Sequence, residues 1–136
     1  MKKTLTKEER ELLIKDLLLR TQTDVLVKVP GEEDPKELRK RIRWMIVYGR
    51  AKSLEDCLDG LIPYLRPFSD MTEKEAEELK KMCWWADELD DNRPWVHNGD
   101  LDYVLDGIQY LLSHYFDIWN LLGKDLAIEA PKGMYA

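Results

Sequence analysis

The chain has 136 residues, of which 44% are hydrophobic and 35% charged, and this balance indicates a globular rather than a disordered protein. A formal net charge of −6 disfavours a general nucleic-acid binder. No apolar run approaches the roughly 20 residues that cross a bilayer, and the first residues lack the apolar stretch of a signal peptide. We therefore expect a cytoplasmic protein without membrane association, folded as a single domain over residues 1–136.

The first predicted elements are a helix and a strand. Thr6 and Glu9 have the spacing of a capping box, and the leucines that follow are spaced for one buried helix face up to about Arg20. β-Branched residues over 24–29 then predict a strand, which the Pro30-Gly31 pair ends.

Residues 36–48 fit two structures. A helix would place Leu38, Ile42 and Ile46 on one face, whereas a strand would place Ile42, Trp44 and Ile46 on one face. The β-branched and aromatic run over 42–48 favours the strand. A short helix over 53–60 is expected to follow.

The stretch from Pro63 to Glu75 has the most distinctive local pattern. Pro63 and Pro67 fix φ and favour an extended, non-helical backbone, which we call the proline strap (residues 63–71). Thr72 and Glu75 form a second capping-box pattern, which predicts the start of a helix. We expect Arg66 to pair with one of the carboxylates of the second half of the chain.

Apolar residues recur every three and four positions from Asp100 to Leu122, which predicts the strongest helix of the chain, with Gly123 after its end. Residues 126–130 predict a short final strand. The expected fold is α+β, with a sheet of two or three strands and three main helices: Thr6–Arg20, Glu73–Leu89 and Asp100–Leu122.

Three segments resemble an uncharacterised family of small proteins from gut bacteria and their phages. Residues 63–73, Pro-Tyr-Leu-Arg-Pro-Phe-Ser-Asp-Met-Thr-Glu, resemble its PYLRPxSxMTEEE signature. Residues 114–117 and 126–135 resemble its HxFD…GLAIEAPxGMY ending, and residues 5–17 are similar to its opening helix. Residues 30–53 depart from the pattern. The resemblance implies a phage-related origin and a β-rich segment after the first helix, and it assigns no catalytic residue.

Metal and catalytic sites have weak sequence support. His97, His114, Cys57 and Cys83 lack the close pairing of zinc ligands, so we expect no metal, no cofactor and reduced thiols. His114 and Asp117, three residues apart on the predicted helix, suggest a small enzyme with a general base, but no nucleophile motif accompanies them.

Two groups of residues are candidates for binding. Seven basic residues against one acidic residue over 36–52 give this segment a charge of +6 (7 − 1). A nucleic-acid-associated factor would use Arg39, Arg41, Arg43 and Trp44 for backbone contact and base stacking. A protein partner would instead contact the aromatic and strap residues Tyr64, Arg66, Trp84, Trp85 and Trp95.

The favoured function is a non-enzymatic protein-interaction protein of phage or mobile-element origin, with an unknown protein partner. The nucleic-acid factor and the small enzyme are the alternatives.

Overall fold

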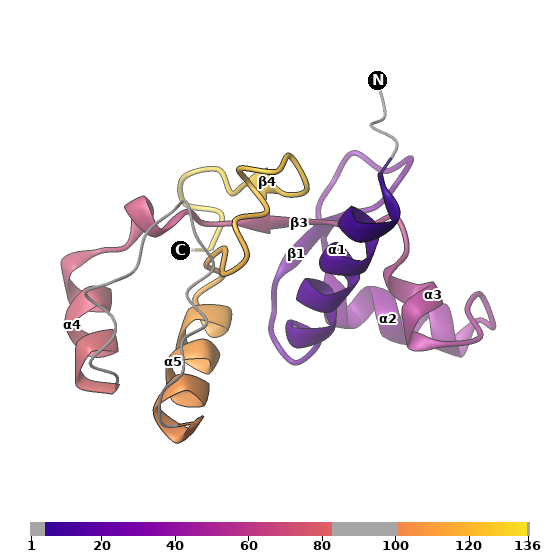
Figure 1. Cartoon of the computed structure of the whole chain (residues 1–136). Helices are drawn as coiled ribbons and strands as arrows, with labels where there is room; N and C mark the ends of the chain where they lie inside the picture. Colours follow the sequence, from indigo (N-terminus) through magenta and orange to yellow (C-terminus); the bar gives the residue numbers. More distant parts are fainter. Residues whose placement is uncertain (1–4, 83–100, 136) are drawn as a thin grey trace. The chain divides into compact units, whose positions relative to one another are not determined.

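The computed structural model describes residues 5–82 and 101–135 of the chain (Figure 1). The predicted α+β class is confirmed, although the described residues form four strands, in the order β2-β1-β3-β4, rather than two or three. No helix in the described part of the chain has the length and apolarity to cross a membrane. The elements are α1 (Lys7–Leu19), β1 (Leu26–Lys28), β2 (Lys36–Glu37), α2 (Leu38–Val47), α3 (Leu54–Leu58), β3 (Ile62–Leu65), the 3-10 turn η1 (Phe68–Asp70), α4 (Glu73–Met82), α5 (Leu101–Ser113) and β4 (Ile128–Glu129).

The chain divides into two compact units, Met1–Tyr64 and Leu65–Ala136. The expectation of a single domain stays a prediction.

The N-terminal unit begins with the predicted capping box. The Thr6 hydroxyl accepts the Glu9 N–H at 3.1 Å, and the Glu9 carboxylate accepts the Thr6 N–H at 3.0 Å. These two bonds satisfy donors that the first helical turn leaves open. The helix they start, α1, buries Leu13 and Leu17, and α3 packs against both α1 and α2.

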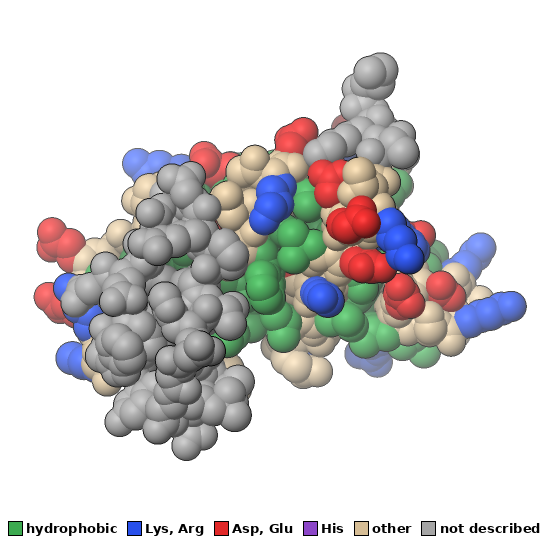
Figure 2. Space-filling model, viewed as in Figure 1, with side chains coloured by type: hydrophobic (Ala, Val, Ile, Leu, Met, Phe, Trp, Pro, Cys, Tyr) green, Lys and Arg blue, Asp and Glu red, His purple; other side chains and the backbone are tan. Residues whose placement is uncertain are grey.

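The central strand of this unit is β1. It pairs antiparallel with β2, where Val27 lies opposite Lys36, and with the first half of β3, where Val27 lies opposite Pro63. Val25, Val27 and Val29 are all buried, as the period-two pattern predicted. Figure 2 shows acidic side chains lying beside basic ones on the surface of this unit.

The prediction of a strand over residues 42–48 is wrong, because residues 42–47 belong to α2 and Tyr48 is its C-cap. Leu38 at the start of α2 is fully buried, and this anchor fixes the helix on its unit. Gly49 follows the end of the helix with φ +64°. The Gly49 N–H donates to the Ile46 carbonyl at 3.1 Å, and the Arg50 N–H donates to the Met45 carbonyl at 2.8 Å. This is a Schellman motif, so a local stop signal and tertiary packing outweigh the strand propensity of the sequence.

In the C-terminal unit, α4 packs against α5 (Figure 1). The predicted helix Glu73–Leu89 is described as far as Met82, and residues 83–89 lie outside the described part. The predicted final strand is present as β4, and the Ala130 N–H donates to the Leu65 carbonyl at 2.9 Å. The core of the unit is formed by Leu79, Tyr110, Leu111, Leu112, Phe116 and Ile118.

The predicted helix end at Leu122 is also wrong, because α5 ends at Ser113. The Phe116 N–H bonds the Leu111 carbonyl at 2.9 Å, the Tyr115 N–H bonds the Leu112 carbonyl at 3.0 Å, and Tyr115 has φ +68°. This is a second Schellman motif, with Tyr115 at the position that glycine usually occupies. The apolar spacing continues past the stop because Phe116 still packs into the core, where it is fully buried.

Candidate functional site

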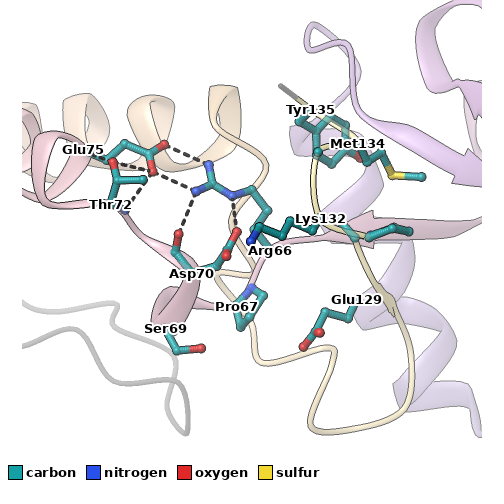
Figure 3. Close-up of a pocket in the computed structure, with 13 residues that line it drawn as sticks. Arg66, Pro67, Ser69, Asp70, Thr72, Glu75, Glu129, Lys132, Met134 and Tyr135 are labelled. Atoms are coloured by element: carbon teal, nitrogen blue, oxygen red, sulfur yellow. Dashed lines mark hydrogen bonds and ion pairs between the residues drawn. The ribbon is translucent and has the colours of Figure 1, made fainter.

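Arg66 is the centre of the proline strap. Its backbone pairs with the segment after α5: the Arg66 N–H donates to the Tyr115 carbonyl at 2.8 Å, and the Arg66 carbonyl accepts the Asp117 N–H at 2.9 Å. Its guanidinium lies between Asp70 and Glu75 (Figure 3). The predicted pairing of Arg66 with a carboxylate is thereby confirmed.

All five N–H donors of the Arg66 guanidinium are used. Two reach the Glu75 carboxylate, both at 2.8 Å. Two reach Asp70, one its carboxylate at 2.9 Å and one its backbone carbonyl at 3.0 Å, and the fifth reaches the His114 carbonyl at 3.1 Å. The guanidinium also lies 4.3 Å from the centroid of the Phe116 ring. Because no donor remains for a ligand, Arg66 acts as a structural connector.

Glu75 joins this connection to the start of α4. Its carboxylate accepts the Thr72 N–H at 3.0 Å, and its own N–H donates to the Thr72 hydroxyl at 3.2 Å, which confirms the second capping box. Hydrogen bonding to Arg66 is the largest cause that lowers the pKa of Glu75 from 4.5 to about 2, against partial burial, which raises it. Arg66 therefore ties the N-terminus of α4 to the C-terminus of α5.

A hollow of about 560 Å³ lies beside this connection (Figure 3). Its walls come from strap residues such as Pro67 and Ser69 and from residues 129–135 near the C-terminus. The two segments that carry the strap and ending signatures thus form one cavity. Arg66, Asp70 and Glu75 at its wall are already bonded to one another, so they offer little to a ligand.

His114 and Asp117 make separate contacts. The Nδ1 of His114 lies 3.0 Å from the Glu75 carboxylate, and its ring stacks on Tyr110 with centroids 4.2 Å apart. The Asp117 carboxylate accepts the N–H groups of Leu121 at 2.8 Å and Leu122 at 2.9 Å. Asp117 therefore caps a turn, and the catalytic arrangement suggested by the sequence is not formed between these two side chains as the structure describes them.

The aromatic candidates divide into two groups. Tyr64 is only 9% exposed, so it anchors the chain rather than offering a binding surface. Trp84, Trp85 and Trp95 lie outside the described residues.

Four of the seven exposed large hydrophobic residues of the described chain lie on α2 and the residue after it, and we call this region the α2 surface (residues 42–48). Ile46 is 58% exposed, Val47 66% and Tyr48 65%, and Trp44 is 43% exposed. Beside it a groove of about 410 Å³ lies between α2, the start of α3 and the residues after α1. The groove is lined by Thr21, Gln22, Arg39, Ile42, Arg43, Ile46, Val47 and Leu54.

The cations of the basic segment differ in their partners. Four of them lie within 4 Å of carboxylates of their own unit: Lys36 and Arg41 near Glu32, Arg39 near Asp24, and Lys40 near Glu37. Arg43, Arg50 and Lys52 form no ion pair with any residue that the structure describes. The positive charge that is open to a partner is therefore concentrated at Arg43 and towards the end of the segment.

The nucleic-acid candidates lie on different sides of α2. Arg41 and Trp44 line a second hollow together with Glu32 and Glu37, and the Arg41 guanidinium lies 5.0 Å from the centroid of the Trp44 ring. Arg39 and Arg43 line the groove instead. The four residues therefore do not form one continuous basic face.

The sequence reasoning missed the exposure of Ile46 and Val47 and the buried pair of Asp16 and Arg20. Asp16 and Arg20, four residues apart on α1, form two hydrogen bonds of 2.8 and 3.0 Å, and both side chains are fully buried. The i, i+4 spacing of these opposite charges indicated that they would make contact. Nothing in the sequence indicated that the pair would be buried. Across residues 5–82 and 101–135, no three His, Cys, Asp or Glu side chains gather as metal ligands.

Comparisons of the chain with protein-family models, with curated proteins and with solved structures found no match.

Proposed function

We propose that the chain is a non-enzymatic protein-interaction protein of the cytoplasm that binds its partner through the α2 surface. The observation that carries this proposal is the exposure of three consecutive apolar residues, Ile46 (58%), Val47 (66%) and Tyr48 (65%). Exposed apolar patches with a polar rim are typical of protein interaction sites, and Trp, Tyr and Arg are the residue types that contribute most to binding.

The other candidate sites support this choice. The Arg66 guanidinium has no free donor, and the Asp117 carboxylate is bonded to two backbone N–H groups. The resemblance to a family of small proteins from gut bacteria and phages is consistent with a binding protein of phage origin. A binding site on α2 does not depend on Arg66 or Asp117 being available to a ligand.

Affinity capture with two paired variants tests the proposal. The variant Ile46→Asp/Val47→Asp removes the centre of the α2 surface. The matched control, Leu18→Asp/Leu19→Asp, changes an adjacent apolar pair on α1 that is 41% and 46% exposed. Circular dichroism first establishes that both variants fold.

We expect one protein to be captured from a lysate of the source organism by the wild type and by the control, and to be lost with the α2 variant. The captured protein, once purified, should bind the wild type directly with the same dependence. Retention by the α2 variant, equal loss in both variants, or no captured protein would each contradict the proposal.

A nucleic-acid-associated factor is the second candidate, because Arg41 stacks on the exposed Trp44 and Arg43 lies nearby on α2 without an ion pair in the described chain. It predicts binding of single-stranded DNA that weakens with salt and is lost in Arg41→Glu/Arg43→Glu. The contacts of Arg39 and Arg41 with Asp24 and Glu32 disfavour it. Absent or unchanged binding in that experiment would eliminate it.

A further inference from the structure

The groove beside α2 is lined by apolar side chains together with the cations Arg39 and Arg43. Ile42, Ile46, Val47 and Leu54 supply apolar side chains, and Arg43 lies among them. α2 has 10 residues, which corresponds to a length of about 15 Å. The groove follows α2 from Arg39 to Val47, about 12 Å along the helix axis, which suits about two turns of an amphipathic helix.

Two arginines without ion pairs in the described chain flank the apolar pair along the sequence. Arg43 precedes Ile46 by three residues, and Arg50 follows Val47 by three. The Schellman motif at Gly49 holds the backbone of Arg50 at the end of α2 through its 2.8 Å bond to the Met45 carbonyl. Along the sequence, the apolar pair therefore lies between two cations. Arg43 lines the groove, whereas Arg50 lies outside the lining, with its guanidinium 6.0 Å from the centroid of the Trp44 ring.

A ligand that is complementary to this groove carries both apolar side chains and carboxylates. The groove lining contains no aromatic ring, since Trp44 lines the other hollow, so the stacking that single-stranded nucleic acid uses is not offered there. Charged groups around an apolar centre are typical of the rim of a protein interface. These observations favour a peptide segment over a nucleic acid.

We propose that the α2 groove binds an acidic amphipathic helix of a partner protein, with apolar side chains on Ile46 and Val47 and carboxylates towards Arg43 and Arg50. This inference rests on the proposed function and specifies the chemistry of the partner segment. The chain carries a net charge of −6, which repels an acidic peptide in general. A preference for such a peptide would therefore locate the attraction at these two arginines.

Two synthetic 18-residue peptides test the inference against the full chain by fluorescence anisotropy. Both carry Leu at helical i, i+3, i+4, i+7 spacing, and the remaining positions are mainly Glu in one and mainly Lys in the other. We expect the wild type to bind the Glu peptide at least tenfold more tightly than the Lys peptide, and less tightly as salt increases.

A charge-swap variant, Arg43→Glu/Arg50→Glu, should reverse this preference. The matched control is Lys7→Glu/Lys15→Glu, which changes the net charge equally at two exposed cations of α1. It should keep the preference for the Glu peptide. Equal binding of the two peptides by the wild type, no binding up to 1 mM, or reversal in the control would overturn the inference.

Two further measurements exclude other occupants. Tighter binding of a 20-nucleotide single strand than of the Glu peptide, lost in the charge-swap variant, would assign the groove to nucleic acid. A dimer in sedimentation that dissociates in Ile46→Asp/Val47→Asp would assign it to a second copy of this chain. Either result overturns the inference. If capture of the partner protein is lost in Ile46→Asp/Val47→Asp but is unchanged in the charge-swap variant, the inference is overturned. The proposed function is not contradicted by that result.

Discussion

Replacing Arg66 with methionine should destabilise the C-terminal unit by about 2–3 kcal/mol. The variant keeps most of the apolar length of the side chain but removes the guanidinium, which is bonded to Glu75, Asp70 and the His114 carbonyl. The Glu75 side chain is only 13% exposed, so its charge would remain partly buried without its main partner.

The magnitude follows from the two ion pairs of Arg66. The pKa of Glu75 falls from 4.5 to about 2, and a fall of about 2.5 corresponds to roughly 3 kcal/mol. Arg66 accounts for only part of this fall, because Thr72 also donates to the carboxylate. The Asp70 side chain is 61% exposed, so its pair with Arg66 contributes little.

Urea unfolding followed by circular dichroism measures the effect, and amide hydrogen exchange assigns it to the C-terminal unit. The matched control is Arg39→Met, which removes a 2.7 Å ion pair with Asp24 in which both side chains are 57% exposed. That variant should lose no more than about 1 kcal/mol. If Arg66→Met costs no more than Arg39→Met, burial of the Arg66–Glu75 pair does not contribute to stability and the reasoning is refuted.

The same pair predicts a pH dependence. The pKa of Glu75 is lower in the folded chain than its ordinary value of 4.5, so its stabilisation is complete above about pH 4.5 and is lost as the pH falls towards 2. In Arg66→Met the loss of stability over this range should be smaller than in the wild type. Identical profiles for the two proteins would contradict the assignment.

Three predictions concern the N-terminal unit. Asp16→Ala should cost about 3–5 kcal/mol in urea unfolding, because it removes the Asp16 carboxylate from the fully buried pair with Arg20. Asp16→Leu/Arg20→Met should recover much of the loss, and equal losses in the two variants would contradict this. In a Cys83→Ser variant, Cys57 should react with a thiol reagent only as fast as the protein unfolds. Cys57 is 2% exposed, and burial raises the pKa of its thiol. Immediate reaction of Cys57 would contradict its burial. Gly49→Ala should cost about 1 kcal/mol through its φ of +64° alone, since nothing lies within 4 Å of an added Cβ, and Gly49→Asn should cost less.

Local signals in the sequence predicted the helix starts well. The capping boxes at Thr6 and Thr72 form as expected because each depends only on residues three positions apart. The helix ends were predicted less well. Tyr115 ends α5 in a left-handed conformation that its residue type does not signal, and the apolar spacing continues because Phe116 enters the core by another route.

The candidate site depended on long-range packing. The pairing of Arg66 with a carboxylate was predictable from the acidic second half, but the partner Glu75 and the contact with the His114 carbonyl depend on the fold. On α2, Gly49 was a visible stop signal, yet the β-branched residues before it suggested a strand. The helical spacing places Leu38 and Ile46 on one face, yet Leu38 is buried and Ile46 is exposed, so no local pattern reports the exposure of Ile46 and Val47.

Site-specific photo-cross-linking tests most directly whether the partner binds at α2 rather than beside Arg66. A photoreactive amino acid is placed at Val47, on the α2 surface, or at Lys132, an exposed residue that lines the hollow next to Arg66. With the captured partner present, we predict a cross-linked product from position 47 and none from position 132. A product from position 132 alone would contradict the account.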